Sequence, residues 1–237
     1  MGLVAWIDGT FYPKYQGNWD DTLFRDRILQ SVTPGSQILD IGAGAGIVAA
    51  MNFRGIAGRV CGIDLDPRVE QNPLLDEGRI SDAGAIPYPD ATFDLVFADN
   101  VMEHLDDPVG VFTEIARVLK PGGELLFKTP NRNHYMPLIA RWTPHGFHQW
   151  INKRRGREEV DTFPTRYRAN SAAQVRAVAR ASGLKVQRIE LIEGRPEYLR
   201  LSAITYLAGL VYEKIVNVTD VLATLRILLI VSLRKPV

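Results

Sequence analysis

Short apolar segments recur along the chain and alternate with polar, turn-rich stretches. Those at residues 37–41, 59–63, around 80, 93–98 and 124–129 have the length and composition of buried strands. Helical stretches are expected between them, most clearly after Asp107, the predicted N-cap, and Pro108, the predicted first helical residue. Strands that alternate with helices are typical of a parallel sheet covered on both faces.

The pattern changes towards the two ends of the chain. Residues 1–36 are predicted to be a helical preamble, in which Asp20 or Asp21 is the N-cap of a helix that ends at Leu29. Residues 171–182 are expected to form another helix. The remainder is expected to supply a strand, one or two helices and a last strand at 227–233.

The first predicted strand leads into three alternating glycines, Gly42, Gly44 and Gly46, and the second ends at Asp64. Glycine has no Cβ, so the backbone at these positions approaches a ligand closely and adopts positive φ. An acid about 20 residues beyond such a loop is placed to accept hydrogen bonds from ribose hydroxyls. The pattern therefore predicts a nucleoside site at the carboxyl edge of a parallel sheet.

The glycine spacing narrows the choice of nucleoside. Dinucleotide-binding folds use G-x-G-x-x-G, whereas this loop reads G-x-G-x-G and has Ile47 where the third glycine of that motif would fall. The sequence also lacks the G-x-x-x-x-G-K-[ST] pattern of a P-loop. A nicotinamide-dependent oxidoreductase is therefore the alternative enzyme class and not the leading one.

Together these motifs resemble the class I S-adenosylmethionine-dependent methyltransferases, in particular the small-molecule branch related to the ubiquinone-biosynthesis, or type 11, methyltransferases. The motifs that carry the resemblance follow one another at residues 39–46, 62–64, 81–83, 87–96, 101–105 and 118–123. The resemblance implies an α/β, doubly wound, mostly parallel seven-stranded Rossmann-like sheet with its last strand antiparallel. We expect one domain over residues 1–237, with a cofactor-binding core at 37–130 and closing helices and strands at 171–237.

The resemblance also implies the cofactor, S-adenosyl-L-methionine, and its product, S-adenosyl-L-homocysteine. In such enzymes the strand-end acids hold the methionine end, the ribose and the adenine, and the glycines admit the ligand. Carried over to this sequence, the methionine end is assigned to Asp40, Asp99 and Asn100, the ribose to Asp64, and the adenine to Leu65, Asp82 and Ala83. The glycines that admit the ligand are Gly42, Gly44 and Gly46. The alternative for the strand-end acids is that each caps the helix that follows it.

The long segment 131–170 follows the fifth strand and is predicted to cap an acceptor pocket, since ordinary connections in such folds have about 2–6 residues. Its histidines, His134, His145 and His148, are the candidate catalytic bases, and a base favours an alcohol acceptor and hence O-methylation. The alternatives are a packed surface excursion with structural histidines, and an acid–base pair formed by Glu103 and His104. No metal site is predicted.

The overall composition limits the partners and the compartment. A net charge of +1 gives no reason to expect nucleic acid, and a single cysteine, Cys61, suits a reducing cytoplasmic compartment. The apolar segment 199–218 has a charge-free run of 12 residues, Leu201 to Tyr212, which is too short to span a membrane. It is expected to be a buried or partner-packed helix, with peripheral membrane contact as the alternative.

The acceptor is expected to be a small molecule, a lipid or a glycan precursor. A non-catalytic cofactor-binding partner subunit is the alternative from outside the enzymes. The sequence predicts no oligomeric state.

Overall fold

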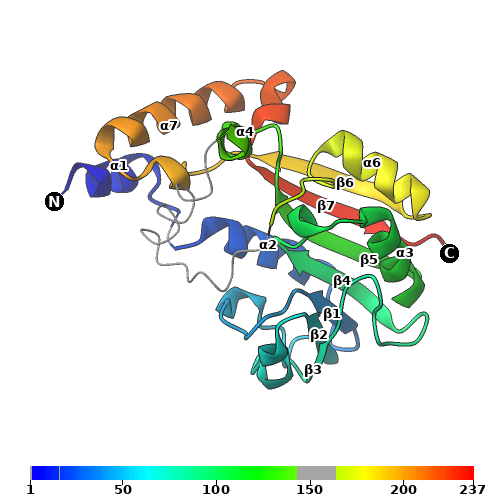
Figure 1. Ribbon diagram of the computed structural model, residues 1–237. Coiled ribbons are helices and arrows are strands. Elements are labelled where there is room, and N and C mark those ends of the chain that lie inside the picture. Colours follow the sequence, from blue (N-terminus) through cyan, green and yellow to red (C-terminus); the bar gives the residue numbers. More distant parts are fainter. Residues whose placement is uncertain (1, 16, 143–163) are drawn as a thin grey trace.

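The computed structural model describes residues 2–15, 17–142 and 164–237 and is built on one seven-stranded sheet (Figure 1). The order of its strands is β3-β2-β1-β4-β5-β7-β6, and β7 runs antiparallel to both of its neighbours. The strands are β1 (Gln37–Ile41), β2 (Arg59–Asp64), β3 (Glu77–Ile80), β4 (Phe93–Asp99), β5 (Leu119–Pro130), β6 (Lys185–Ile192) and β7 (Leu228–Arg234). The predicted sheet, including its antiparallel last strand, is confirmed.

The α-helices lie before, between and after these strands. They are α1 (Leu3–Phe11), α2 (Trp19–Leu29), α3 (Pro108–Val118), α4 (Tyr135–Trp142), α6 (Ala172–Ala181) and α7 (Ala203–Asn217). Asp107 caps α3 as predicted, because its side chain accepts a hydrogen bond from the Gly110 N–H. The prediction that Asp20 or Asp21 caps α2 is wrong: the N-cap is Asn18, and both carboxylates instead bind a buried lysine.

The expected helices between β1, β2 and β3 are absent from the described chain. These connections contain only the 3₁₀ turns η1 (Ala49–Met51) and η2 (Pro67–Gln71). Met51 and Phe53 are buried against the sheet next to Phe97, so loop side chains cover the area that a helix was expected to fill. This end of the sheet is therefore covered by shorter elements than predicted.

Each face of the sheet has its own apolar core. On one face, α3 and α6 bury side chains such as Phe112, Ile115 and Val175 against the sheet. On the other face, α2 buries Phe24 and Ile28 in the same way. The alternating burial of β1 and β4 side chains serves both cores, as expected for strands covered on two sides.

Helices α1 and α7 lie side by side at the upper left of Figure 1, apart from α3 and α6. A small third cluster, built on Ile7, Tyr12 and Tyr206, joins the two helices. Since α7 is connected to β6 at one end and to β7 at the other, the pair is attached to the outer strands of the sheet.

Candidate active site

The loop after β1 is shaped by its three glycines, whose φ angles are +79°, +49° and +74° at Gly42, Gly44 and Gly46. A Cβ on Gly42 would lie 2.4 Å from Cγ2 of Val101, and one on Gly46 would lie 2.3 Å from Oδ1 of Asn72. At Gly44 the nearest atom to a Cβ would be Oδ2 of Asp64, at 3.8 Å. Neighbouring side chains therefore fill the space beside Gly42 and Gly46, whereas the space beside Gly44 is open.

Asp64 at the end of β2 fixes this opening. Its Oδ2 accepts a hydrogen bond from the Gly44 N–H at 2.8 Å, and its Oδ1 accepts one from the Asp66 N–H at 2.9 Å. Each carboxylate oxygen can accept two hydrogen bonds, so both oxygens keep capacity for a ligand hydroxyl. This geometry is compatible with the predicted ribose contact, which stays a prediction.

Sequence reasoning missed Asn72, which lies between β2 and β3. Its side chain is buried, and its Nδ2 donates to the carbonyl oxygens of Ala43 and Gly44 at 2.9 and 3.1 Å. Its Oδ1 accepts from the Leu74 N–H. Asn72 thus holds the glycine loop from a different connection, and no local motif in the sequence marks that role.

Asp40 and Asp99 are buried acids on the neighbouring strands β1 and β4. Burial, followed by the charges of Asp99 and Asp64, raises the pKa of Asp40 well above its usual range. Burial also raises the pKa of Asp99 to about 6, although the nearby Lys128 ammonium lowers it. A cationic ligand beside these groups would favour their charged forms.

Lys128 on β5 is the second residue that sequence reasoning missed. Its side chain is fully buried, and its Nζ lies 2.9 Å from Asp20, 2.5 Å from Asp21 and 3.0 Å from Asp99. Burial lowers the pKa of Lys128, but the three carboxylates outweigh that effect and hold it above its usual value. The lysine therefore joins the start of α2 to the carboxyl ends of β4 and β5. Its position in an apolar strand did not indicate that its ammonium would be buried among three carboxylates.

Asn100 follows Asp99 and has a φ of +54°, which is uncommon for a residue other than glycine. Its Nδ2 donates to Oδ1 of Asp99 at 2.9 Å, and its N–H donates to the carbonyl oxygen of Lys128 at 2.9 Å. Both predicted methionine-side residues therefore lie in one hydrogen-bonded group with Lys128. Backbone strain of this kind gathers at functional sites.

The predicted adenine-side residues follow β2 and β3. The Leu65 side chain is exposed, and Asp82 lies after β3, where its Oδ1 accepts from the Gly84 N–H at 2.7 Å. Ala83 packs against the apolar core. The Ser81 N–H donates to the Asp64 carbonyl, which ties the ends of the two strands together. Their contacts with a nucleoside stay predictions.

His134 is almost completely buried at the start of the segment after β5. Its Nδ1 accepts from the Met136 N–H at 3.2 Å, and its Nε2 lies 3.6 Å from Oε2 of Glu193, beyond hydrogen-bonding distance. Burial lowers the pKa of His134 to about 3 and raises that of Glu193 to about 8, so both are neutral at pH 7. The His134 ring is therefore shielded from solvent, and its role as a base stays a prediction. His145 and His148, the other two candidate bases, lie outside the described residues.

Glu103 and His104 form the 3₁₀ turn η3 (Met102–His104) after β4. The buried Glu103 carboxylate accepts from the Thr129 hydroxyl at 2.8 Å, and its carbonyl oxygen accepts from the N–H groups of Arg166 and Tyr167. For this pair the alternative to an acid–base role is that it forms the turn into the next helix, and these contacts support the turn. Within the described ranges, no group of three or more His, Cys, Asp or Glu side chains is arranged to hold a metal ion.

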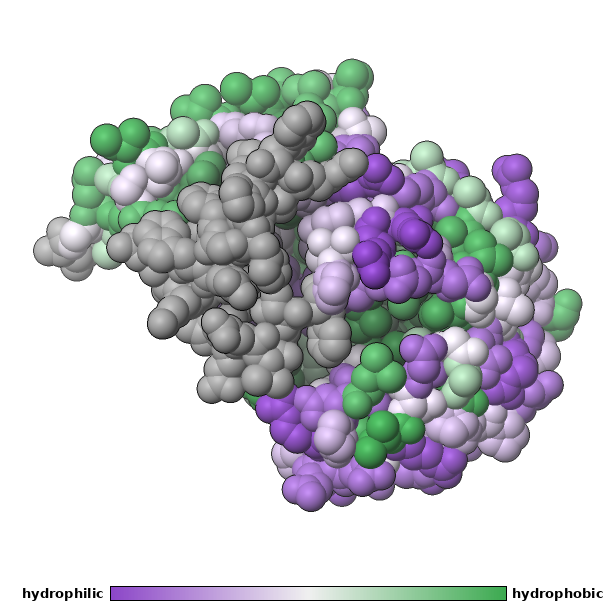
Figure 2. Space-filling model, in the orientation of Figure 1, coloured by the Kyte–Doolittle hydropathy of each residue, from purple (hydrophilic) through white to green (hydrophobic). Residues whose placement is uncertain are grey.

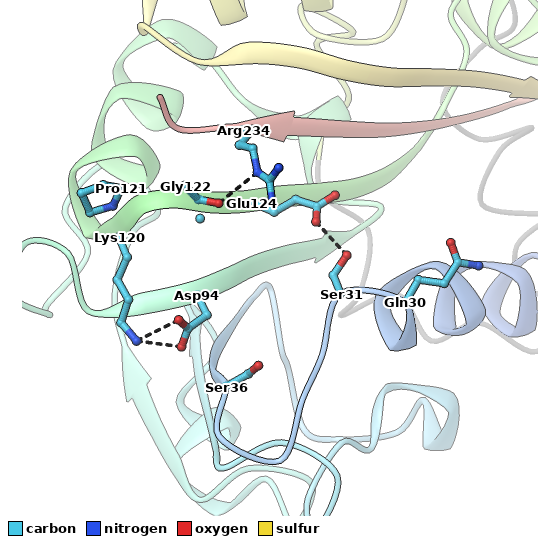
Figure 3. A pocket seen from close by; sticks show the side chains of 10 residues that line it. Gln30, Ser31, Ser36, Asp94, Lys120, Pro121, Gly122, Glu124 and Arg234 are labelled. Atoms are coloured by element: carbon cyan, nitrogen blue, oxygen red, sulfur yellow. Dashed lines mark hydrogen bonds and ion pairs between the residues drawn. The ribbon is translucent and has the colours of Figure 1, made fainter. Parts of the chain in front are cut away.

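A surface pocket of about 450 Å³ lies at the opposite, amino edge of the sheet (Figure 3). There Lys120 forms an ion pair with Asp94 at 2.8 Å, Ser31 donates to Glu124 at 2.7 Å, and Arg234 donates to the Gly122 carbonyl at 3.0 Å. These polar groups satisfy one another. The pocket lies at the wrong end of the strands to belong to the glycine-loop site.

A family model described as "Methyltransferase domain" matches residues 39–127 of this chain. Over 143 residues the chain is 34% identical to the Cereibacter sphaeroides "Ubiquinone biosynthesis O-methyltransferase", covering 53% of this chain and 58% of that protein. The protein of the same name from Thiobacillus denitrificans is 35% identical over 115 residues, which cover 45% of this chain and 49% of that one. The chain thus spans about half the length of the curated relatives it matches.

Solved structures extend the likeness of the fold to almost the whole chain. The [4+2]-cyclase SpnF aligns with a TM-score of 0.59 and 21% identity, covering 94% of this chain and 85% of that one. A Streptomyces coelicolor geranyl diphosphate C-methyltransferase aligns with a TM-score of 0.55 and 16% identity, covering 91% and 78%. At these identities the likeness shows the fold alone, and the first structure is named for a different reaction.

Proposed function

Because the core of this chain is a class I S-adenosylmethionine-dependent methyltransferase domain, we propose that the protein binds S-adenosylmethionine beside Gly44 and Asp64 and methylates a hydroxyl group. The acceptor is a small molecule, a lipid or a glycan precursor. The names of the curated relatives support methyl transfer to oxygen and argue against the nicotinamide alternative.

The observation that carries this proposal is the group of acids around the open space beside Gly44. Asp40, Asp64 and Asp99 lie at or next to the carboxyl ends of adjacent strands, and burial, followed by the charges of Asp99 and Asp64, raises the pKa of Asp40. Such a group of carboxylates fits a ligand that carries a sulfonium and an ammonium, because each cation offsets the repulsion among them. The residues present therefore fit the cofactor.

The bound cofactor supplies an already activated methyl group, so the main task of the protein is to orient the two reactants. Orientation of this kind is worth about 7–11 kcal/mol of barrier. Asp64 holds the sugar hydroxyls, and Asp99 and Asn100 border the reacting end. Lys128 holds the Asp99 carboxylate in place through their 3.0 Å ion pair. The residues that border the reacting end are therefore attached to the sheet.

Removal of the acceptor proton is assigned to His145 or His148, in the segment predicted to cap the pocket. His134 is instead a positioning residue, because its Nδ1 accepts from Met136 and its Nε2 faces Glu193. This assignment retains the predicted cap and base but reduces the candidate bases from three to two.

The test is calorimetric titration of S-adenosylhomocysteine into the wild type and Asp64→Ala. We expect the variant to bind about 10- to 150-fold more weakly, since about 1.5–3 kcal/mol of charge-assisted hydrogen bonding is lost. Asp90→Ala, which removes an exposed carboxylate near α3, is the matched control and should bind normally.

Activity is tested in a separate experiment. The protein is incubated with methyl-labelled cofactor and with lipid, glycan, protein and metabolite pools, and the label in each pool is measured. Label in a base-stable ether of one pool supports O-methylation and identifies the acceptor class. Equal dissociation constants for the wild type and Asp64→Ala would remove Asp64 from the site, and label only in protein would contradict the proposed acceptor.

A further inference from the structure

Helix α7 presents its apolar side chains to the outside. The exposed positions Ile204, Leu207, Val211, Ile215 and Val218 follow helical spacing along one face, and Ile204 and Val218 are 82% and 81% exposed. The opposite face buries Tyr206 and Glu213. A helix on an ordinary protein surface has the reverse arrangement.

This face continues onto α1 and onto the 3₁₀ turn η6 (Asp220–Leu225), which flank α7 in the structure. Figure 2 shows hydrophobic residues gathered along the upper edge of the molecule, where α7 lies. We call it the outer apolar surface; it comprises Leu3, Trp6, Phe11, Leu201, Ile204, Leu207, Val211, Ile215, Val218, Val221 and Leu225. Contiguous exposed apolar patches of this kind mark contact sites.

The acids of α1 and α7 are held on the inner side of the two helices. Asp8 accepts from Arg200 at 2.6 Å and from the Tyr206 hydroxyl at 2.5 Å. Glu213 is buried and accepts from the Asn217 amide at 2.8 Å. The outward faces of α1 and α7 therefore carry no carboxylate. The exposed Asp220 lies in η6, between Val218 and Val221 of the surface, and its carboxylate pairs with Arg226.

The exposed charge on α7 itself is positive. The Lys214 side chain is 59% exposed on α7, and its ammonium has three N–H donors, of which the ion pair with Glu213 at 3.1 Å uses one. Trp6 lies exposed on α1, and tryptophan is enriched where protein meets the boundary between lipid and water. An apolar helical face with a basic border is typical of helices that lie in a membrane interface.

We propose that the outer apolar surface binds an anionic lipid membrane, with α1 and α7 lying flat in the interface and Lys214 directed at lipid phosphates. In the part of the chain that the structure describes, no helix is long and apolar enough to cross a bilayer, so the contact is peripheral. The proposal goes beyond methyl transfer and does not depend on it.

A second copy of the chain fits this surface less well than lipid does. A two-fold contact uses the same patch on both molecules, so it would enclose Lys214 of each copy. The outward faces of α1 and α7 offer no further carboxylate, so each enclosed ammonium would keep its ion pair with Glu213 but lose the water at its other N–H groups, which is costly. Lipid phosphates supply a further partner and leave the ammonium in contact with water.

The test is co-sedimentation of the full chain with vesicles of phosphatidylcholine alone or mixed with phosphatidylglycerol. We expect tighter binding to the mixed vesicles and a decrease with added salt. The double variant Ile204→Asp with Val218→Asp should bind at least about tenfold more weakly, since two apolar side chains leave the lipid. Lys214→Gln should reduce the preference for the anionic vesicles.

The matched control is the double variant Val109→Asp with Val237→Asp, which adds the same charge at exposed apolar positions elsewhere. It should bind vesicles as the wild type does, and thermal unfolding checks that all variants fold. Absence of wild-type binding to either vesicle, or equal loss in the control, overturns the proposal. So does a dimer in light scattering that dissociates in the α7 variant while vesicle binding is absent. The readout needs no methyl transfer, so its failure leaves the proposed activity standing.

Discussion

The sheet core and the α1–α7 pair are built in opposite ways. In the core, α3 turns Phe112 and Ile115 inward against the sheet. In the α1–α7 pair, the inside combines the small cluster of Ile7, Tyr12 and Tyr206 with an ionic and hydroxyl network around Asp8 and Glu213, and most of the large apolar side chains of α7 lie outside. The first arrangement derives its stability from burial, whereas the second leaves apolar surface available for a partner.

The difference shows that an apolar helical segment in a sequence does not specify whether its apolar side chains face the core or the outside. The segment 199–218 was expected to be buried or packed on a partner, with membrane contact as the alternative. The structure makes it one α-helix, α7, preceded by the turn η5 (Glu197–Leu199), and buries only one side of that helix. The following variants test the contrast between the two regions.

The largest effect is expected in the core, for Phe112→Ala on α3. Phe112 is fully buried and packs edge-on against Phe127, with 5.7 Å between ring centroids. Its loss should reduce the free energy of unfolding by about 3–5 kcal/mol, through lost burial and the cavity left behind. Val109→Ala, at an exposed position of the same helix, should change it by less than about 0.5 kcal/mol in urea unfolding.

A smaller effect, visible only as pH rises, is expected where α7 meets the sheet. The pKa of Glu193 is raised by burial to about 8, from 4.5. A raised pKa of an acid means that stability is lost as the pH rises to the folded value, here over roughly pH 4.5–8. Between about pH 6.5 and 8.5 the wild type should lose about 1–2 kcal/mol, and Glu193→Gln should not.

The neighbouring His134 does not produce this loss, because its pKa is lowered from 6.5 to about 3 and it therefore adds stability as the pH rises to about 6.5 and slightly above. That contribution is common to the wild type and Glu193→Gln. Asp220→Asn, which changes an exposed acid, should follow the wild type. Parallel pH curves for the wild type and Glu193→Gln would show that Glu193 does not titrate in this range.

The smallest effect is expected inside the α1–α7 pair, for Tyr206→Phe. The ring remains to pack against Tyr12, and only the hydroxyl that donates to Asp8 at 2.5 Å is removed. Because Asp8 keeps its ion pair with Arg200, the loss should be about 1 kcal/mol. A loss as large as that of Phe112→Ala in the same unfolding measurement would mean that the pair is organised like the core.

The sequence predicted the strands well because each is an apolar run bounded by turn residues. It failed between β1 and β3, where side-chain packing and not local pattern determines the structure: Met51 and Phe53 insert from loops. It also misjudged Asp20 and Asp21, since an acid before a helical segment looks like a cap when the lysine that binds it lies on a distant strand.

For the candidate site, motifs identified the residues that lie on the loop and at strand ends. Asn72 and Lys128 were missed because their roles depend on partners far away in the sequence, at Gly44 and Asp99. His134 was assigned from its residue type, and its burial beside Glu193 depends on packing that the sequence does not show.

The contact between Gly46 and Asn72 has a consequence for how this loop can change over evolution. Any side chain at Gly46 would strike Oδ1 of Asn72, while a smaller residue at position 72 would release the carbonyls of Ala43 and Gly44. Neither position can vary alone without damage, so a lineage that leaves this loop shape must pass through a defective intermediate or change both codons together.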